Sequence, residues 1–363
     1  MERTLEEAGY VGVSVEVRDG RHRVRARAGE AEPGSGRPVP YGAALRAAST
    51  TKAFVATVVL QLVAEGRLSL DDTVERWLPG VVTGNGNDGD RVTVRHLPQH
   101  TSGIHSYPSV RDLFPAGCSA RGYYDNRFRH HTAGEPVAGA MRWPPRFEAG
   151  TGYACSNTDY VLAGMIIERV TGRTWRHEVR DRIIRPLALT GTSLPADDPR
   201  PPSPYVHGYH TYAEDGRRVD TTLFDSTAAD ASGALVTTPE DVNRFFTALI
   251  GGRLPGPDEP AEMQRTRAVP DEPGRGYGPG LERTALSCGG FYRHHGGNAL
   301  GHAGENGVTA DGRRAVTVST NSFDTFDGER QDRIDEAMRD LIDRALCDGR
   351  PGPARGRPGP AED

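Results

Sequence analysis

Apolar and polar positions alternate near both ends of the chain, which is the pattern of strands that bury one face. Valines occupy every second position from 11 to 17, and a second short strand follows the Asp19-Gly20 turn, so that 9–28 predicts two paired strands. The segment 315–320 has the same apolar and β-branched character. Both ends of the chain therefore predict strands, and we expect them to share one sheet.

Between these strands the apolar positions change to helical spacing, which predicts buried helical faces. A helix is expected from Ser49 onward, and further helical regions are expected over 157–184, 238–250 and 330–346, with Gly172 ending the first segment of 157–184. From residue 349 the chain is rich in Pro, Gly and Arg, which is typical of a disordered tail. We see no internal repeat. Strands at both ends with helices between them predict one sheet and an inserted helical region.

Composition narrows the classes of function. The 363 residues are 36% hydrophobic and 26% charged, as in ordinary globular proteins, and the net charge of −5 argues against a nucleic-acid partner. Membrane insertion is not expected, because no apolar run approaches about 18 residues. The acidic N-terminus lacks the pattern of a secretory signal. We therefore expect a cytoplasmic protein, or a secreted one if a leader was removed.

Lysine usage singles out one residue for chemistry. Lys52 is the single lysine among the 44 Lys and Arg residues. Arginine replaces lysine readily at a solvated surface, but it cannot lose its proton in a protein. Lys52 also closes an S-x-x-K pattern with Ser49 at the start of a predicted helix, and positions i and i+3 share a helix face. The amine is thus expected to take the proton of the Ser49 hydroxyl and to activate it as a nucleophile.

Several further strings resemble one family, the serine penicillin-binding proteins and class C β-lactamases, with the soluble serine DD-carboxypeptidases as the most similar type. The strings follow the family's order from about residue 10 to 347 and comprise Ser49-Thr50-Thr51-Lys52, 61–72, 92–97, His100-Thr101-Ser102-Gly103, 147–153, Ser156-Asn157-Thr158-Asp159-Tyr160, 233–241, 277–281 and 301–304. The resemblance implies an α+β fold of the β-lactamase/transpeptidase type. Its antiparallel sheet would be flanked by helices and formed by 1–66 and 225–347. A mostly helical domain would be inserted over 67–224, and a disordered tail would cover 348–363.

The resemblance also implies roles for individual residues. Ser49 matches the acyl-accepting nucleophile and Lys52 its proton partner. Asn157 matches the asparagine of the family's Tyr-x-Asn motif. His302-Ala303-Gly304 is assigned to the third motif, a basic residue followed by x-Gly, and His295-Gly296-Gly297 is a weaker candidate for it. The backbone N–H groups of Ser49 and Glu305 would form the oxyanion hole.

Two departures put the standard activity in doubt. Cys155 occupies the position of the motif's tyrosine, which transfers protons in the family. A thiol titrates in a useful range, but it is shorter by roughly a phenol ring, so that a water would have to bridge the gap. Three interpretations stay open: weakened activity, a retuned but working site, or Cys155 itself as the nucleophile. Whether Cys155 is natural or was introduced is also open.

The second departure concerns specificity. The relatives hold the substrate's terminal carboxylate with an arginine and a third-motif hydroxyl, and these positions fall on Glu282 and Ala303, with Arg283 next to the first. An acid there would repel a carboxylate and favour an amine. We therefore do not expect D-Ala-D-Ala peptides to be the natural substrate.

The four cysteines lack metal-ligand spacing, and no H-E-x-x-H or C-x-x-C motif occurs, so that neither a metal nor an organic cofactor is expected. Cys288 and Cys347 occupy positions that carry a disulfide in the carboxypeptidase relatives. Such a bond would imply an oxidising compartment, in conflict with the missing signal.

The sequence thus predicts a serine hydrolase or acyltransferase that forms an acyl-enzyme on Ser49 with a small-molecule amide or ester. The natural substrate, the acceptor and the oligomeric state stay open. The alternative is a weakened or silent relative that binds a ligand or a partner in the same cleft.

Overall fold

A nine-stranded antiparallel sheet forms one side of the molecule in the computed structural model, which describes residues 10–107, 114–214, 216–254, 262–263, 265–270 and 272–348. Its order is β2-β1-β15-β14-β12-β11-β10-β9, and β13 pairs with β14. The strands are β1 (Gly12–Asp19), β2 (His22–Gly29), β9 (Arg267–Ala268), β10 (Gly276–Gly278), β11 (Leu281–Ala285), β12 (Phe291–His294), β13 (Gly297–Ala299), β14 (His302–Thr309) and β15 (Arg314–Thr320). The predicted sharing of one sheet by both ends of the chain is confirmed, because β1 pairs with β15 from Val13↔Thr320 to Asp19↔Arg314.

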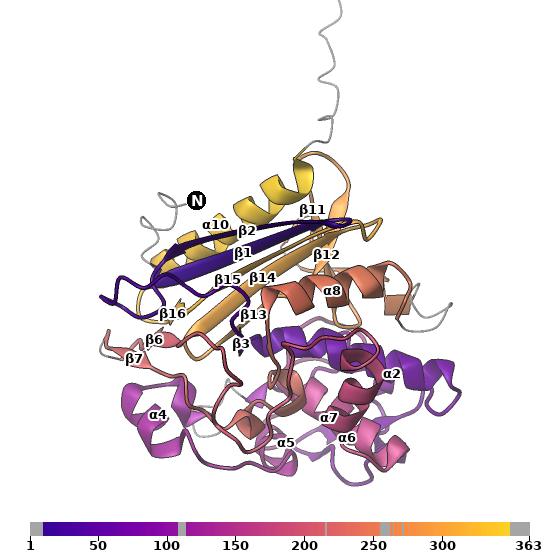
Figure 1. Ribbon diagram of the computed structural model, residues 1–363. Helices are drawn as coiled ribbons and strands as arrows, with labels where there is room; N and C mark the ends of the chain where they lie inside the picture. The colour runs from indigo at the N-terminus through magenta and orange to yellow at the C-terminus, as the bar shows by residue number, and fades with distance from the viewer. Residues whose placement is uncertain are drawn as a thin grey trace, which may run out of the picture.

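Helices cover both faces of this sheet (Figure 1). The C-terminal helix α10 (Gly328–Cys347) packs Ile334, Met338 and Ile342 against the apolar side of β1 and β15. On the other face, α8 (Pro239–Ile250) meets a polar side, where Asn243 donates to the carbonyl of Glu16 and accepts from Thr317. Apolar and polar residues therefore alternate along β1 and β15 because each face meets a different helix.

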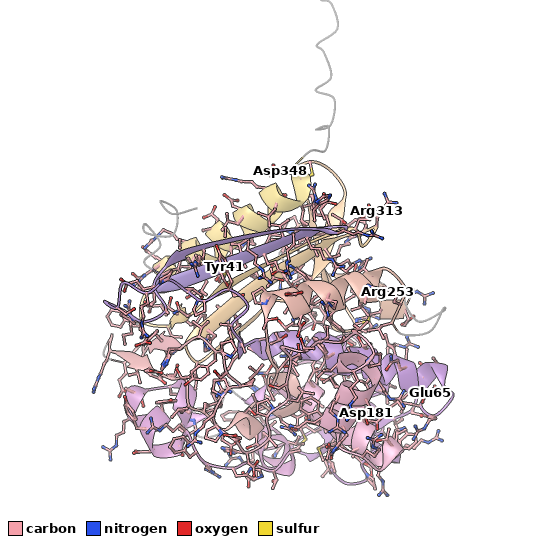
Figure 2. The ribbon with its side chains drawn as sticks, viewed as in Figure 1. Tyr41, Glu65, Asp181, Arg253, Arg313 and Asp348 are labelled. Atoms are coloured by element: carbon pink, nitrogen blue, oxygen red, sulfur yellow. A yellow bond between two sulfur atoms is a disulfide. The ribbon has the colours of Figure 1, made fainter. Side chains whose placement is uncertain are left out.

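The helical part lies beneath α8 and is centred on α2 (Thr51–Ala64) and α6 (Asn157–Thr171) (Figure 1). Nearly every α2 residue is buried, and Phe54 stacks on Phe245 of α8 with ring centroids 3.7 Å apart. A helix that is apolar all round belongs in a core. In Figure 2, Glu65 at the end of α2 and Asp181 lie in the helical part, away from the sheet.

Short elements complete the described chain. The helices are η1 (Ala48–Thr50), α3 (Val74–Trp77), η2 (Val94–His96), η4 (Pro115–Gly117), α4 (Ala120–Asn126), α5 (Gly134–Ala140), α7 (Trp175–Val179), the π-helical η5 (Arg180–Ile184), η6 (Ser226–Ala228) and η7 (Asp230–Ser232). The small sheets pair β3 (Leu45–Arg46) with β8 (Val236–Thr237), β4 (Thr83–Gly84) with β5 (Asn87–Asp88), and β6 (Tyr209–Thr211) with β7 (Arg218–Asp220) and β16 (Ser322–Asp324).

The helical region predicted over 157–184 is confirmed, and its first segment ends at Gly172 as expected. Gly172 ends α6 in the left-handed conformation, with a φ of +73°, and the chain restarts at α7 behind the Thr174 cap. The domain limits at residues 66 and 225 stay a prediction. Apart from Asp348, the predicted tail 348–363 lies outside the described residues.

Cys288 and Cys347 form a disulfide with Cα atoms 5.8 Å apart, as the family resemblance implied. It joins the end of α10 to the turn between β11 and β12. None of the described helices combines the length and the apolar character needed to cross a membrane.

Candidate active site

Ser49 lies at the point where the chain leaves β3 and enters α2, within the short helix η1. The preceding residue, Ala48, has a φ of +45°, a left-handed conformation that non-glycine residues rarely adopt. Thr51 holds this turn: its hydroxyl donates to the carbonyl of Ala48 at 2.6 Å and accepts from the backbone N–H of Leu235 at 3.0 Å. Strained backbone of this kind clusters at functional sites.

Lys52 is buried directly behind Ser49. Its Nζ lies 2.8 Å from the Ser49 Oγ and 2.9 Å from the carbonyl oxygen of Ser232, and the residue is 0% exposed. Burial lowers the pKa of Lys52 to about 8 and outweighs the opposing electrostatic interactions with Cys155, Asp159 and Glu282. Near neutral pH this amine has a free lone pair much more often than a surface lysine, so that it can accept the Ser49 proton.

The strand that lies against Ser49 is β13, which follows His295 and Gly296. A Cβ added at Gly297 would lie 2.5 Å from both the Ala47 carbonyl oxygen and the Ser49 nitrogen. Asn298 and Asn157 line the same cavity as Ser49. The segment that the sequence ranked second for the third motif, His295-Gly296-Gly297, is therefore the one beside the nucleophile.

The structure does not bring His302 to this site. Its ring is buried, its Nε2 lies 3.0 Å from the Val206 carbonyl oxygen, and it packs closely against Gly208. Ala303 lies in the apolar core under α10. The assignment of the third motif to His302 and Ala303 has to be corrected, because both residues follow the β13–β14 turn and point elsewhere.

Glu305 also lies away from the nucleophile. It pairs with Val318 in the middle of the sheet, and its carboxylate lies under Gly296 and 3.7 Å from His294. Its backbone N–H does not meet the Ser49 turn, which faces β13. The predicted pairing of Ser49 with Glu305 therefore has to be corrected, because the strand that lies against the Ser49 turn is β13.

Glu282 is buried at the back of the site and is already paired. Its carboxylate lies 2.5 Å from Arg275 and 4.0 Å from His294. Burial alone would raise the pKa of Glu282, but His294, His295 and Arg275 together hold it below the usual value. This acid is ionised and charge-compensated, so that it exerts less repulsion on a substrate carboxylate than the sequence suggested.

Two residues of the site, His100 and Asp159, belong to strings of the sequence that resemble the family, but no role was predicted for either of them. His100 lies behind Cys155, with its Nε2 3.8 Å from the Cys155 sulfur, and Asp159 lies behind His100. Both are buried, whereas Cys155 is exposed. Their position next to the S-x-x-K helix was not visible in the sequence, since 48 or more positions separate them from Lys52 and from one another.

Tyr277 and His295 form a second buried pair beside the cysteine. The Tyr277 hydroxyl lies 3.0 Å from the His295 Nε2, and burial lowers the pKa of His295 to about 4. The ring of Tyr277 also contacts those of His100 and Tyr153. Histidine is therefore neutral in the reassigned third motif.

A cavity of about 240 Å³ opens in front of Ser49. Its walls are largely apolar and include Tyr107, Phe114, Phe224, Leu300 and Phe323, while Arg46 and His210 add polar groups. Within the described ranges, the cavity's lining includes no acidic side chain, and no three His, Cys, Asp or Glu residues are arranged to hold a metal ion. The space suits a compact, mainly apolar acyl group.

Solved structures with this architecture include several hydrolases. The chain matches a D-stereospecific amidohydrolase from Streptomyces sp. with a TM-score of 0.84 and 38% identity, covering 93% of this chain and 97% of the other. It matches a D-amino acid amidase from Ochrobactrum anthropi SV3, complexed with L-phenylalanine amide, with a TM-score of 0.79 and 28% identity, covering 95% and 96%.

Among curated proteins, Esterase EstB of Burkholderia gladioli is 31% identical over 207 residues, which are 54% of this chain and 50% of that protein. The chain thus spans about half the length of this relative. The Beta-lactamase family model matches residues 1–339. With the nucleophile, its lysine and the sheet arranged as described, the chain belongs to the β-lactamase family of serine hydrolases.

Proposed function

We propose that this protein hydrolyses a small amide or ester through an acyl-enzyme formed on Ser49. The contact of 2.8 Å between the buried Lys52 amine and the Ser49 hydroxyl carries this proposal. The Oγ of Ser49 attacks the carbonyl carbon as its proton passes to Nζ of Lys52. The backbone N–H groups of Ser49 and Asn298 stabilise the oxyanion. The amine or alcohol then leaves, and water cleaves the resulting ester.

The substrate class follows from the apolar walls of the cavity and from the scarcity of groups that could bind a terminal carboxylate. Apolar walls in front of Ser49 favour an aromatic or aliphatic acyl group. The reassigned third motif has Gly296 where the carboxypeptidase type of site has a hydroxyl, and the guanidinium of Arg275 is taken up by Glu282. A terminal carboxylate would therefore find few partners. Amides of apolar amino acids, the kind of compound named for one structural relative, fit better.

The experiment compares D- and L-phenylalanine amide with a D-Ala-D-Ala peptide, using purified protein and Ser49→Ala as the control. We expect ammonia release from a phenylalanine amide, little cleavage of the peptide and no turnover in the variant. Cleavage of the peptide alone would contradict the substrate class. Intact-protein mass after a fluorophosphonate or a penicillin tests the nucleophile independently.

A second candidate function is a catalytically silent protein that binds a ligand in the same cavity. The observation that favours it is Cys155, which leaves the position of the motif's tyrosine without a phenol. Absence of any adduct with both probes, together with saturable binding of a phenylalanine amide, would support this candidate over the enzyme.

A further inference from the structure

Cys155 is the exposed end of a chain of side chains that runs into the core. Its sulfur lies 3.8 Å from the His100 Nε2, and the His100 Nδ1 lies 3.3 Å from the Asp159 Oδ2. The Asp159 Oδ1 accepts from the Ser102 hydroxyl at 2.5 Å. His100 and Asp159 are 1% and 0% exposed. An exposed thiol that interacts electrostatically with Lys52 is thus backed by a buried imidazole and a buried carboxyl.

The hydrogen bonds around His100 fix which nitrogen carries its proton. The backbone N–H of Ser156 donates to Nδ1 at 3.2 Å, so that Nδ1 is an acceptor. Burial keeps the pKa of His100 well below its usual value, so that the ring is neutral and its one proton lies on Nε2, facing the Cys155 sulfur. Burial also raises the pKa of Asp159 well above its ordinary range, and a protonated carboxyl removes the repulsion between Oδ2 and Nδ1.

We propose that His100 donates a hydrogen bond to the Cys155 sulfur and so enables this thiol, through one water molecule, to protonate the leaving group released from Ser49. The proposal rests on the proposed function and assigns His100 as a positioning residue that acts through Cys155. With this hydrogen bond and the water, the shorter side chain of Cys155 can transfer the proton that the phenol of the motif's tyrosine would transfer.

The protons balance over the acylation step. Ser49 gives its proton to Lys52 as the C–O bond forms. The thiol then gives a proton through the water to the leaving nitrogen as the C–N bond breaks. The thiolate that remains faces the His100 N–H and the new Lys52 ammonium, with which Cys155 interacts electrostatically. Transfer of the proton from the Lys52 ammonium to the Cys155 thiolate restores the neutral amine and the thiol without another reactant.

The test compares two substrates that differ only in their leaving group. Ammonia leaves an amide only when the nitrogen is protonated, whereas p-nitrophenolate leaves an ester without a proton. The same phenylalanyl acyl group is therefore presented as the amide and as the p-nitrophenyl ester, and kcat/KM is measured for both. In Cys155→Ser and His100→Gln we expect the amide-to-ester ratio to fall at least tenfold. His302→Gln is the matched control, a buried histidine outside the site, and should leave the ratio unchanged.

An unchanged ratio in Cys155→Ser would overturn the inference, and so would an equal loss on both substrates in a folded His100→Gln. If His100→Gln does not fold, Cys155→Ser decides alone, since its side chain is exposed. These outcomes differ from failure of the proposed function, in which the wild-type protein turns over neither substrate and takes up no fluorophosphonate.

A thiol measurement gives a readout apart from turnover. In a Cys118→Ser background, the rate of Cys155 alkylation by iodoacetamide is followed against pH in the wild-type and His100→Gln proteins. Loss of the N–H donor should move the alkylation profile to higher pH, and an unmoved profile would contradict the hydrogen bond. Other charged or titratable groups interact with the sulfur, and both proteins share them: Lys52, Tyr153, Asp159, Tyr160, Arg275, Tyr277 and Glu282.

Discussion

Gly297 and Ser49 are in such close contact that no side chain fits between them. A Cβ on Gly297 would lie 2.5 Å from the Ser49 nitrogen and 3.0 Å from that of Thr50. The backbone of β13 therefore reaches the turn that carries Ser49 directly. Because Gly297 has no side chain, the two backbones can approach each other closely.

Gly297→Ala should impair acylation strongly while the protein stays folded. The methyl group would push β13 away from Ser49 and open the proposed oxyanion hole, and loss of one such donor typically costs about 10²–10³ in kcat. Gly304→Ala is the matched control, since Gly304 pairs with Gly297 and an added Cβ there would approach other atoms no closer than 3.6 Å. Acylation rates with a fluorophosphonate test this, and equal effects of both variants would count against it.

Lys52→Arg should abolish turnover although the positive charge is kept. Arginine cannot accept the Ser49 proton, and loss of a general base typically costs about 10²–10⁴ in rate. The measurement is kcat/KM on a phenylalanine amide, with circular dichroism to confirm folding. Activity within tenfold of the wild-type value would exclude Lys52 as the base.

The pH profile should report the titration of Lys52. Its neutral form is the active one, and its pKa is about 8, so that kcat/KM should fall about tenfold for each pH unit below that value and level off above it. Glu282 favours the ammonium form. Glu282→Gln should therefore shift the acid limb to lower pH, and a shift to higher pH would contradict this electrostatic coupling.

Cys155→Tyr should raise amide turnover. The position is exposed, so that a phenol has room, and its hydroxyl would reach the site without the bridging water. The comparison is amide kcat/KM for Cys155→Tyr and Cys155→Ser, which should change in opposite directions. A lower amide kcat/KM in both variants would show that the reaction needs the thiol and that neither hydroxyl can replace it.

Removal of the Cys288–Cys347 disulfide should destabilise the protein without altering the site. The bond closes a loop of 59 residues, for which chain entropy predicts up to about 4 kcal/mol of free energy of unfolding. Cys288→Ser should lower the melting temperature by several degrees, and a reducing agent should reproduce this in the wild-type protein. Cys118→Ser, which leaves the Cys288–Cys347 bond in place, is the control.

Local patterns were sufficient for much of the fold. Alternating valines predicted β1, and the turn at Asp19-Gly20 is where β1 passes to β2. The Thr238-Pro239 start signal gave the first turn of α8. These features depend on neighbours along the chain, and for that reason they are readable from the sequence. The end of α6 at Gly172 was predicted in the same way, because a glycine just past the last apolar position of a helix favours the left-handed conformation.

Ser49, Lys52, Asn157 and Cys155 were identified from the sequence as candidate site residues, because i to i+3 spacing and short motifs hold their members together. The choice between His295 and His302 for the third motif could not be made from local spacing. Both are histidines followed two residues later by glycine, and only the pairing of β13 with β14 decides which one lies near Ser49. The juxtaposition of His100, Asp159 and Lys52 is likewise a product of packing between segments far apart in sequence. The contact between Ser49 and Lys52 was predictable from the sequence, because a single helical turn brings the two residues together. Which distant groups surround them depends on the folded chain as a whole, because burial and strand register arise only from packing.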